Sequence, residues 1–284
     1  MTYRRERREP ARRGLHGWMS RAIALTVLLH ALALMWLVWR VRDWPLCLAL
    51  LLFNHLVLCV AGLLPRCRLL GANWNRLPLH AAQSGAIALT IDDGPDPLVT
   101  PQVLDILDRF SARATFFCIG SAAMAEPELC REIVRRGHAV ENHSQRHVYR
   151  FSCSGPRAMA REIQRGQRTL LRITGQRPVF FRPPAGLRNP FLDYLLRRCR
   201  LCLASWTRRG YDTRERSPDL VLRRLLRGLA AGDILLLHDG NAARTRDGTP
   251  VIVSVLPRLL AAIAAQGLTT FTLRDILERE QVGG

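Results

Sequence analysis

The sequence of 284 residues contains no lysine. All 42 basic residues are arginine and only 23 residues are acidic, which gives a net charge of +19. We interpret the uniform absence of lysine as a bias in codon composition and not as a functional choice. Helix-turn-helix, zinc-finger and aromatic RNA-binding patterns are absent as well, so we exclude nucleic acid as a partner despite the charge.

The cysteines lack the number and spacing of a disulfide scaffold. Five of the eight lie after residue 76, an odd number without regular spacing. Cys199 and Cys202 have the spacing of a redox pair, but the sequence has no matching second pair. We therefore favour buried thiols over a redox pair at these positions.

Two long apolar runs stand near the start of the chain, from Ala22 to Trp39 and from Trp44 to Leu64. A helix needs roughly 20 apolar residues to cross a bilayer, and only a short connection separates the runs. The sequence therefore predicts a transmembrane helical hairpin at 22–64, between a basic tail at 1–21 and a linker at 65–85. The alternative is a cleavable signal peptide, but the first run is too long and no small-residue cleavage site follows it.

The arginines around these runs predict the orientation of the hairpin. Seven precede the first run, two lie between the runs, and Arg66, Arg68 and Arg76 follow the second. The positive-inside rule then places both ends of the hairpin in the cytoplasm. We expect an integral protein of a bacterial-type inner (plasma) membrane, in contact with membrane lipids, whose later domain faces the cytoplasm. If the second run does not span the bilayer, that domain is exported instead.

Polar residues interrupt the second run at Asn54 and His55. Polar groups inside a membrane are costly, so a functional role is one interpretation. The other is a hydrogen bond across the hairpin to Thr26 or His30, and we favour this second interpretation.

After residue 85, strand-like and helix-like runs alternate along the chain. Strict alternation predicts an α/β fold with parallel strands wrapped by helices. We expect a distorted, incomplete (β/α) barrel over residues 86–275, followed by a tail at 276–284. The chemistry of such barrels lies at the carboxyl ends of the strands. The expected strands are 87–91, 114–119, 139–141, 179–181, 201–206, 233–237 and 268–272.

Three residues predict a metal site. Asp93 follows the first strand run, and His143 and His147 are four residues apart, which would place both imidazoles on one face of a helical turn. One carboxylate and two imidazoles suit zinc, and cobalt, nickel or iron less selectively. Three protein ligands also leave a position for water and substrate, as in a catalytic site. The alternative for the histidine pair alone is a pair on the surface of a helix.

Asp92 and His238 are the candidates for proton transfer. Asp92 is the candidate general base, because a tight metal ligand would keep no free oxygen for the proton. A helix N-cap or turn carboxylate is the alternative. His238 follows the apolar run 233–237 and is the candidate general acid if a neighbouring carboxylate raises its pKa. Its alternative is a buried core histidine.

Five segments in this order resemble the motifs of the polysaccharide deacetylase family, the NodB-homology domain or carbohydrate esterase family 4. They are Thr90–Pro95, His143–His147, Arg182–Gly186, more loosely Trp206–Asp212, and Leu236–His238. The resemblance implies a membrane-anchored member that uses Asp93, His143 and His147 as metal ligands. It also implies that Arg182 orients Asp92 and that Asp212 raises the pKa of His238. The backbone N–H of Ala185, next to Pro184, is then expected to help hold the oxyanion.

Two places depart from the family pattern. Ala185 stands where the third motif often has an aromatic residue, so an aromatic wall of the sugar site is missing. Arg208 and Arg209 stand where the fourth motif frequently has an acidic residue. These arginines would either contact a phosphate, which would suit a diphosphate-linked lipid sugar, or serve as structural partners of Asp212.

The sequence as a whole predicts a membrane-anchored, metal-dependent hydrolase that removes an N-acyl group from an amino sugar. Acetyl is the favoured group and formyl the alternative, and a lipid-linked glycan precursor is the favoured substrate. Two other functions stay open. One is a catalytically silent membrane scaffold that binds a glycan or a partner, and the other is an exported peptidoglycan deacetylase.

Overall fold

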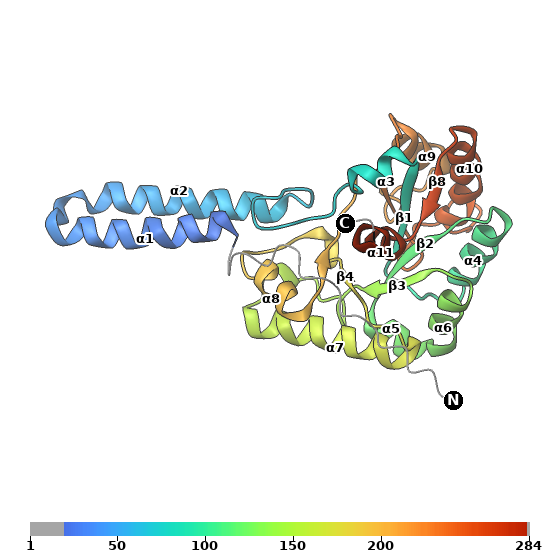
Figure 1. Ribbon diagram of the computed structural model, residues 1–284, viewed down its shortest axis with the longest axis horizontal. Coiled ribbons are helices and arrows are strands. Elements are labelled where there is room, and N and C mark those ends of the chain that lie inside the picture. The colour runs from blue at the N-terminus through green and yellow to red at the C-terminus, as the bar shows by residue number, and fades with distance from the viewer. Residues whose placement is uncertain (1–19, 283–284) are drawn as a thin grey trace.

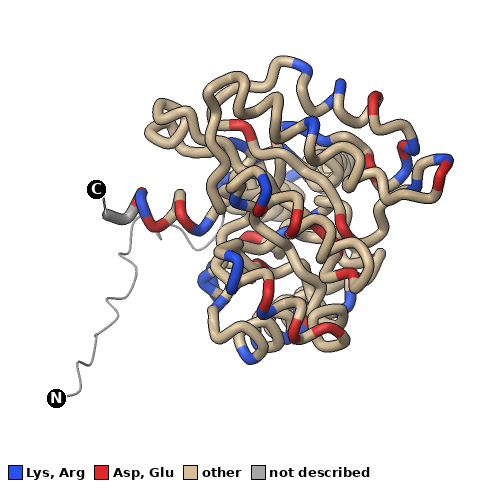
Figure 2. The backbone as a smooth tube through the Cα atoms, turned by 90° about the vertical axis from the view of Figure 1, so that its right-hand side faces the viewer, with Lys and Arg blue, Asp and Glu red and all other residues tan. Residues whose placement is uncertain are grey.

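The computed structural model describes residues 20–282, so most of the predicted basic tail lies outside the described part of the chain. A pair of long helices extends to one side of an α/β domain that the rest of the chain forms (Figure 1). Basic and acidic residues are interspersed over this domain (Figure 2). The molecule thus separates an apolar arm from a charged domain.

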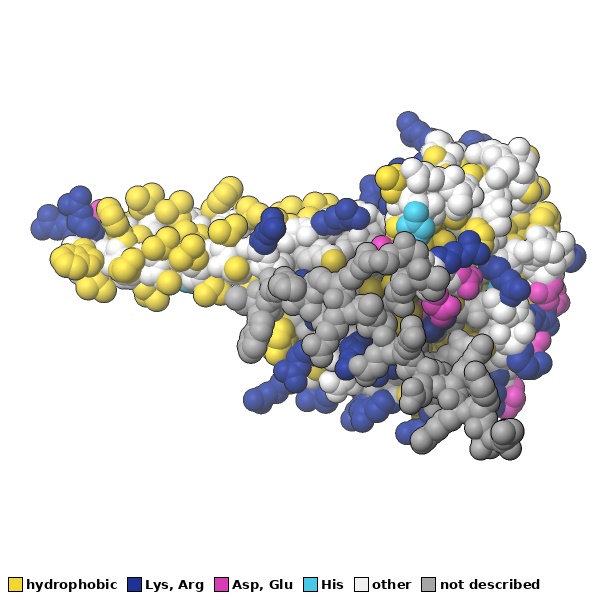
Figure 3. All heavy atoms as spheres, viewed as in Figure 1, with side chains coloured by type: hydrophobic (Ala, Val, Ile, Leu, Met, Phe, Trp, Pro, Cys, Tyr) yellow, Lys and Arg dark blue, Asp and Glu magenta, His cyan; other side chains and the backbone are white. Residues whose placement is uncertain are grey.

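The arm is a helical hairpin. Its helices are Arg21–Trp39 (α1) and Trp44–Leu63 (α2), joined by a 3-10 turn at Val41–Asp43 (η1). Both are long and apolar enough to cross a membrane by length and composition. Hydrophobic side chains cover the outside of the hairpin, and charged side chains gather at its tip (Figure 3).

The polar residues inside the hairpin contact each other. Thr26 Oγ1 donates a hydrogen bond to Asn54 Oδ1 at 3.2 Å. The rings of His30 and His55 meet edge to face, with their centroids 5.2 Å apart. The predicted hydrogen bond across the hairpin is confirmed, with Thr26 as the partner.

The domain contains one parallel sheet, and this confirms the predicted incomplete (β/α) barrel. Seven strands lie in the order β5-β4-β3-β2-β1-β7-β6, and β8 pairs with β1 outside that path. The strands are Ala86–Asp92 (β1), Ala114–Cys118 (β2), Ala139–Asn142 (β3), Phe180–Phe181 (β4), Cys202–Leu203 (β5), Arg208–Arg209 (β6), Ile234–His238 (β7) and Thr269–Phe271 (β8).

Helices surround the curled sheet, most of them on its outer face and the first and last helices of the domain on its concave face. They are Leu79–Gln83 (α3), Thr100–Arg109 (α4), Gly120–Ala125 (α5), Pro127–Arg135 (α6), Pro156–Thr174 (α7), Leu192–Cys199 (α8), Pro218–Leu226 (α9), Val251–Ala265 (α10) and Leu273–Val282 (α11). Short 3-10 turns lie at Phe151–Cys153 (η2) and Pro184–Gly186 (η3). The largest cluster of buried hydrophobic residues joins the central strands to α4, α6, α9 and α10.

Alternation along the central strands decides which residues face the candidate site. In β1, Ile87, Leu89 and Ile91 belong to the large outer core, so Thr90 and Asp92 face the opposite, concave side. In β7, Leu235 and Leu237 likewise face the outer core, which leaves the other face to Ile234, Leu236 and His238. The two polar strand ends therefore lie on one face of the sheet.

Several predicted boundaries differ from the structure. The run predicted as a strand at 201–206 forms only Cys202–Leu203, and the two-residue strand β6 was not predicted. Helix α11 crosses the predicted boundary at residue 275, with Ile276 buried in the core. Cys199 and Cys202 are free thiols, the first buried and the second half-buried.

The predicted linker at 65–85 packs against the domain over much of its length. The Trp74 N–H donates to the Leu203 carbonyl, and the Ser205 N–H donates to the Trp74 carbonyl, each at 2.9 Å. Trp74 thereby forms a parallel bridge with Ala204 beside β5. The Asn73 side chain donates to the Pro65 carbonyl at 2.9 Å. This segment is an edge of the sheet as well as a connection.

Candidate active site

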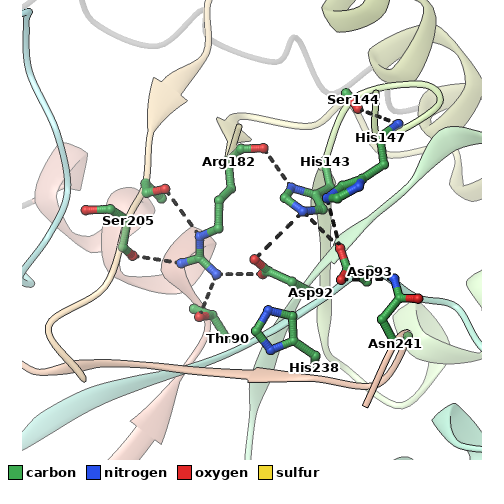
Figure 4. Close-up of polar contacts among 12 residues, drawn as sticks. Thr90, Asp92, Asp93, His143, Ser144, His147, Arg182, Ser205, His238 and Asn241 are labelled. Carbon is green, nitrogen blue, oxygen red and sulfur yellow. Dashed lines mark hydrogen bonds and ion pairs between the residues drawn. The ribbon is translucent and has the colours of Figure 1, made fainter. Parts of the chain in front are cut away.

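The carboxyl ends of β1, β3, β4 and β7 bring the predicted site residues together. Asp92 at the end of β1 is in register with His238 at the end of β7. Strand β3 ends one residue before His143, and β4 ends one residue before Arg182. Figure 4 shows these side chains converging from four segments that are far apart in the sequence.

Asp93, His143 and His147 form a cluster that fits a metal ion. The Nε2 atoms of His143 and His147 lie 3.2 and 3.3 Å from the same atom, Asp93 Oδ1. The three ligand atoms lie within 4.8 Å of one another. Asp93 Oδ1 is buried and has no hydrogen-bond partner among the described residues.

The tautomer of His143 strengthens this fit. Its Nδ1 lies 2.7 Å from the Arg182 carbonyl oxygen, which can only accept, so Nδ1 carries the proton. In the neutral ring Nε2 then presents a lone pair to the Asp93 carboxylate. Two lone pairs that face each other across 3.2 Å require a cation or a proton between them.

The two histidines lie in a loop, so the predicted helical turn is wrong. No helix is assigned to residues 143–147, and Ser144 and His147 have φ angles of 66° and 51°. These left-handed conformations interrupt a right-handed helix. Hydrogen bonds hold the loop instead: the Ser144 N–H donates to Asn142 Oδ1 at 2.9 Å, and the His147 N–H donates to Ser144 Oγ at 3.0 Å.

The electrostatics of the cluster suit a cation. Burial raises the pKa of Asp93, but the proximity and charge of His143, together with the charges of His238 and His147, outweigh it and lower the pKa well below its usual range. Burial and the neighbouring His143 lower the pKa of His147, which favours its neutral form. Burial lowers the pKa of His143, but Asp92 and Asp93 raise it more, so the net direction is upward. A proton therefore competes with a cation for Nε2 of His143 more strongly than for the ring of His147.

Arg182 holds Asp92 from beneath the cluster. The guanidinium is fully buried and donates from Nη1 to Asp92 Oδ1 at 2.6 Å and to Thr90 Oγ1 at 2.8 Å. It also donates from Nη2 to the Ser205 carbonyl at 2.8 Å and from Nε to the Ala204 carbonyl at 3.3 Å. The other oxygen of Asp92, Oδ2, lies 3.9 Å from Nε2 of His143 and faces the cluster.

His238 pairs with Asp212. The Asp212 carboxylate lies 2.9 Å from His238 Nδ1 through Oδ1 and accepts the His238 backbone N–H through Oδ2 at 2.7 Å. Burial lowers the pKa of His238, but the charge and hydrogen bond of Asp212 reverse this and raise it. The neighbouring Asp239 accepts a hydrogen bond from Thr100 at 2.5 Å and is not the partner of His238.

Ala185 lies in η3, immediately after Pro184, on the segment that follows Arg182. It is exposed, and its φ angle of 56° places it in the left-handed region. Within residues 20–282, its backbone N–H donates no hydrogen bond. The N–H is therefore free to bind an oxyanion.

The structure distinguishes between the two roles considered for Arg208 in the fourth motif, a phosphate contact and a structural ion pair. The Arg208 guanidinium forms an ion pair with Asp233 and donates to the Arg227 and Gly228 carbonyls. Arg208 is thus a structural residue, but its partner is Asp233, where Asp212 had been proposed. Its donors are not available to a phosphate.

Sequence reasoning missed four residues around the site. Thr90 and the Ser205 carbonyl bind Arg182, and Asn241 Nδ2 donates to Asp93 Oδ2 at 3.3 Å. Tyr149 is 93 % exposed, and its ring meets that of His147 edge to face with centroids 6.2 Å apart. Thr90 lies two residues before Asp92 on the same strand. Because such residues point to the same face of a sheet, the sequence could have predicted that Thr90 faces the site.

Comparison with known proteins agrees with this geometry. The polysaccharide deacetylase family model matches residues 80–201. The chain is also 32% identical to the peptidoglycan-N-acetylglucosamine deacetylase of Bacillus cereus over 193 residues, which are 67% of this chain and 87% of that relative. The chain belongs to the polysaccharide deacetylase family.

Two further similarities bear on this family member. It is 31% identical to the chitooligosaccharide deacetylase of Sinorhizobium fredii over 209 residues, 70% of this chain and 94% of the relative. The crystal structure of a carbohydrate esterase family 4 pseudoenzyme from Bacillus anthracis is similar with a TM-score of 0.62 and 22% identity, over 69% of this chain and 66% of that one. The second similarity concerns the fold alone.

Proposed function

We propose that this polysaccharide deacetylase family member is a metal-dependent hydrolase that removes an acetyl group from an N-acetylated amino sugar in a glycan. One observation carries the proposal: a three-ligand cluster lies beside an oriented carboxylate, Asp92, and a carboxylate-paired imidazole, His238. Both curated relatives reported above are deacetylases by name, which favours acetyl over formyl.

Asp93, His143 and His147 would hold the cation. One carboxylate and two imidazoles favour zinc, with cobalt, nickel and iron as less selective fits. When bound, the cation polarises the acyl carbonyl and lowers the pKa of a water molecule.

Asp92 acts as the general base in this proposal. It takes one proton of the attacking water while the water oxygen bonds to the carbonyl carbon. Arg182 occupies Oδ1 and leaves Oδ2 for that proton. The ion pair with Arg182 is buried, and the planar guanidinium fixes the direction of the carboxylate.

His238 acts as the general acid. Its bond to Asp212 through Nδ1 leaves Nε2 to protonate the leaving nitrogen as the C–N bond breaks. The products are acetate and a free amine. The Ala185 N–H donates to the oxygen that becomes negative when water adds, which lowers the barrier.

The hairpin anchors the enzyme in a membrane in this proposal. The Arg188 N–H, two residues after η3, donates to the carbonyl of Gly62 in α2 at 3.1 Å. The loop that carries Ala185 thus lies where the hairpin joins the domain. This placement supports a substrate at the membrane surface, with a lipid-linked glycan precursor on the cytoplasmic face as the favoured case. The name of the Bacillus cereus relative favours the alternative of an exported peptidoglycan deacetylase.

A silent scaffold is a weaker proposal for this chain. The Bacillus anthracis pseudoenzyme indicates that a chain of this fold need not be catalytic. A scaffold is expected to have lost the base, a ligand or the acid, and here Asp92, Asp93, His143, His147 and His238 are all present.

The decisive experiment measures free amine released from N-acetylglucosamine oligomers by the full chain in detergent, with added zinc or cobalt. The full chain is needed because the segment before β1 contributes to the sheet edge through Trp74. Asp92→Asn is expected to keep the metal and to lower turnover by about 10²- to 10⁴-fold. Asp93→Ala, His143→Ala and His147→Ala should lose metal and activity together.

Each result has a clear meaning. Wild-type metal content in all three ligand variants would remove the metal site, and full turnover of Asp92→Asn would remove the base. Absence of amine release with metal bound would refute deacetylation of this glycan and direct the search to formylated or lipid-linked substrates.

A further inference from the structure

Arg209 is a fixed cation without an anionic partner. It lies in β6, and its guanidinium carbon is 5.4 Å from the ring centroid of Trp206 and 5.2 Å from that of Tyr211. Among the described residues, no carboxylate forms an ion pair with Arg209, and its buried Nε has no hydrogen-bond partner. The two rings thus hold the group in place and leave its charge unneutralised.

Three arginines near Arg209 each have a carboxylate partner. Arg208 pairs with Asp233, Arg224 with Glu215, and Arg182 with Asp92. Asp212 uses both carboxylate oxygens on His238. The acidic side chains around Arg209 are therefore already engaged.

Arg209 lies next to the candidate active site. The ring of Trp206 that it contacts is also 5.9 Å from the guanidinium of Arg182. A Cβ atom on Gly186, at the end of η3, would lie 2.5 Å from the same ring, so the Ala185 segment packs against it. One aromatic ring therefore connects Arg209 to the arginine that orients Asp92 and to the loop with the free N–H.

Two cations beside one ring repel each other. The guanidinium carbons of Arg182 and Arg209 lie 5.9 and 5.4 Å from the centroid of the same Trp206 ring. A half-buried cation without a partner is unfavourable because its lost hydration is not replaced. Binding an anion at Arg209 would remove both costs.

We propose that Arg209 binds an anionic substituent, a carboxylate or a phosphate, on the amino-sugar substrate. The inference rests on the proposed function and specifies the substrate class as an acidic sugar. A guanidinium is planar and donates two parallel hydrogen bonds to two oxygens of such a group. The Trp206 and Tyr211 rings flank the guanidinium and restrict its movement, so little side-chain freedom is lost on binding.

The test compares three monosaccharides of similar size on the full chain in detergent. N-acetylmuramic acid carries a carboxylate, N-acetylglucosamine phosphate carries a phosphate, and N-acetylglucosamine is neutral. Dissociation constants are measured by calorimetry for the wild type, Arg209→Gln, Arg209→Lys and the control Arg223→Gln. Arg223 is exposed on α9, and no ion pair to it is found among the described residues.

We expect the wild type and the control to bind an acidic sugar at least about tenfold more tightly than the neutral one. Arg209→Gln should lose this preference while its affinity for the neutral sugar and its metal content stay unchanged. Arg209→Lys should keep part of the preference, because lysine retains the positive charge but cannot donate two parallel hydrogen bonds from a planar group. Preference for one acidic sugar over the other would identify the anion as carboxylate or phosphate.

Equal binding of acidic and neutral sugars by the wild type would overturn the inference. Preserved preference in Arg209→Gln would do the same. If Arg209→Gln does not fold, the wild-type preference and the Arg209→Lys variant still decide the question. Because binding is measured without turnover, a failure of the proposed deacetylation is detected separately, as absence of amine release with metal bound.

Discussion

At the scale of single residues, the candidate metal cluster is defined by where its protons are. The Arg182 carbonyl fixes the Nδ1 proton of His143, so Nε2 must lose any second proton before it can bind a cation. Asp92 and Asp93 raise the pKa of this ring above its usual value of 6.5, against the effect of burial. Protons and metal therefore compete at His143.

This competition predicts a pH dependence of metal binding. A raised pKa means that His143 takes up its second proton at a higher pH than an ordinary histidine does, so zinc affinity should begin to fall at a correspondingly higher pH. The expected decrease approaches about tenfold per pH unit once the pH lies below the pKa of His143. Metal titrations at constant ionic strength would measure it.

Asp92→Asn provides the matched variant for this prediction. It removes a charge that raises the pKa of His143, so the midpoint of the pH dependence should move to lower pH, even if overall affinity decreases. An unchanged midpoint would show that Asp92 does not control the proton on His143.

The residues that donate side chains to the site were largely accessible from the sequence, because their chemical types and order are distinctive. Asp92, Asp93 and His238 follow strand-like runs, and their positions depend only on strand alternation. The Ser205 and Ala204 carbonyls that hold Arg182 could not be predicted, since any residue supplies a carbonyl. The sequence shows that Arg208 and Arg209 both depart from the fourth motif of the family. Only the structure shows that Arg208 has a carboxylate partner and that Arg209 has none among the described residues.

At the scale of elements, the end of α2 supports the segment after η3. An added Cβ on Gly62 would lie 2.3 Å from the Arg188 carbonyl oxygen, so α2 approaches this segment as closely as a glycine allows. The Arg188 guanidinium also donates to the Cys67 carbonyl. These contacts connect the hairpin to the loop that contains Ala185.

Gly62→Ala should therefore lower turnover and stability while metal content stays unchanged. In an isolated helix interior the same substitution stabilises the helix by about 1 kcal/mol. The steric clash with the Arg188 carbonyl is expected to destabilise the protein instead, so a lower stability would indicate that the clash dominates. Thermal melting and steady-state kinetics would measure the result. Gly155→Ala is the control, because an added Cβ there meets nothing within 4 Å.

A Gly62→Ala protein that melts at higher temperature and retains wild-type turnover would contradict this role for α2. Loss of metal in the variant would also contradict it, since the metal cluster lies on other segments. Only reduced turnover with the metal retained supports a positioning role for the hairpin.

Elements with a strong hydrophobic period were predicted well, and short irregular ones were not. The long strands β1, β2 and β7 agree with their predicted ranges within about one residue. The spacing of His143 and His147 fits a helical turn as well as a loop, and only the positive φ angles distinguish them. Two-residue strands such as β6 carry no period, so a sequence pattern cannot reveal them.

At the scale of the whole molecule, the distribution of charge around the hairpin predicts which membrane face carries the domain. Arg40 and Arg42 flank the tip, whereas Arg66, Arg68 and Arg76 lie where the hairpin meets the domain. Seven more arginines precede α1 or begin it. The larger basic group stays in the cytoplasm under the positive-inside rule, so we expect the base of the hairpin and the domain there.

Reporter fusions at two positions test this orientation in living cells. A reporter after Gly284 should fluoresce as a cytoplasmic fusion, and a phosphatase that folds only in an oxidising compartment should be inactive at that position. The matched fusion between Arg42 and Asp43, at the hairpin tip, should give the opposite result if both helices cross the bilayer. Phosphatase activity after Gly284 would place the domain outside and favour the exported peptidoglycan deacetylase. The same result at both positions would show that the hairpin does not span the membrane, because its tip and base would then lie on one side.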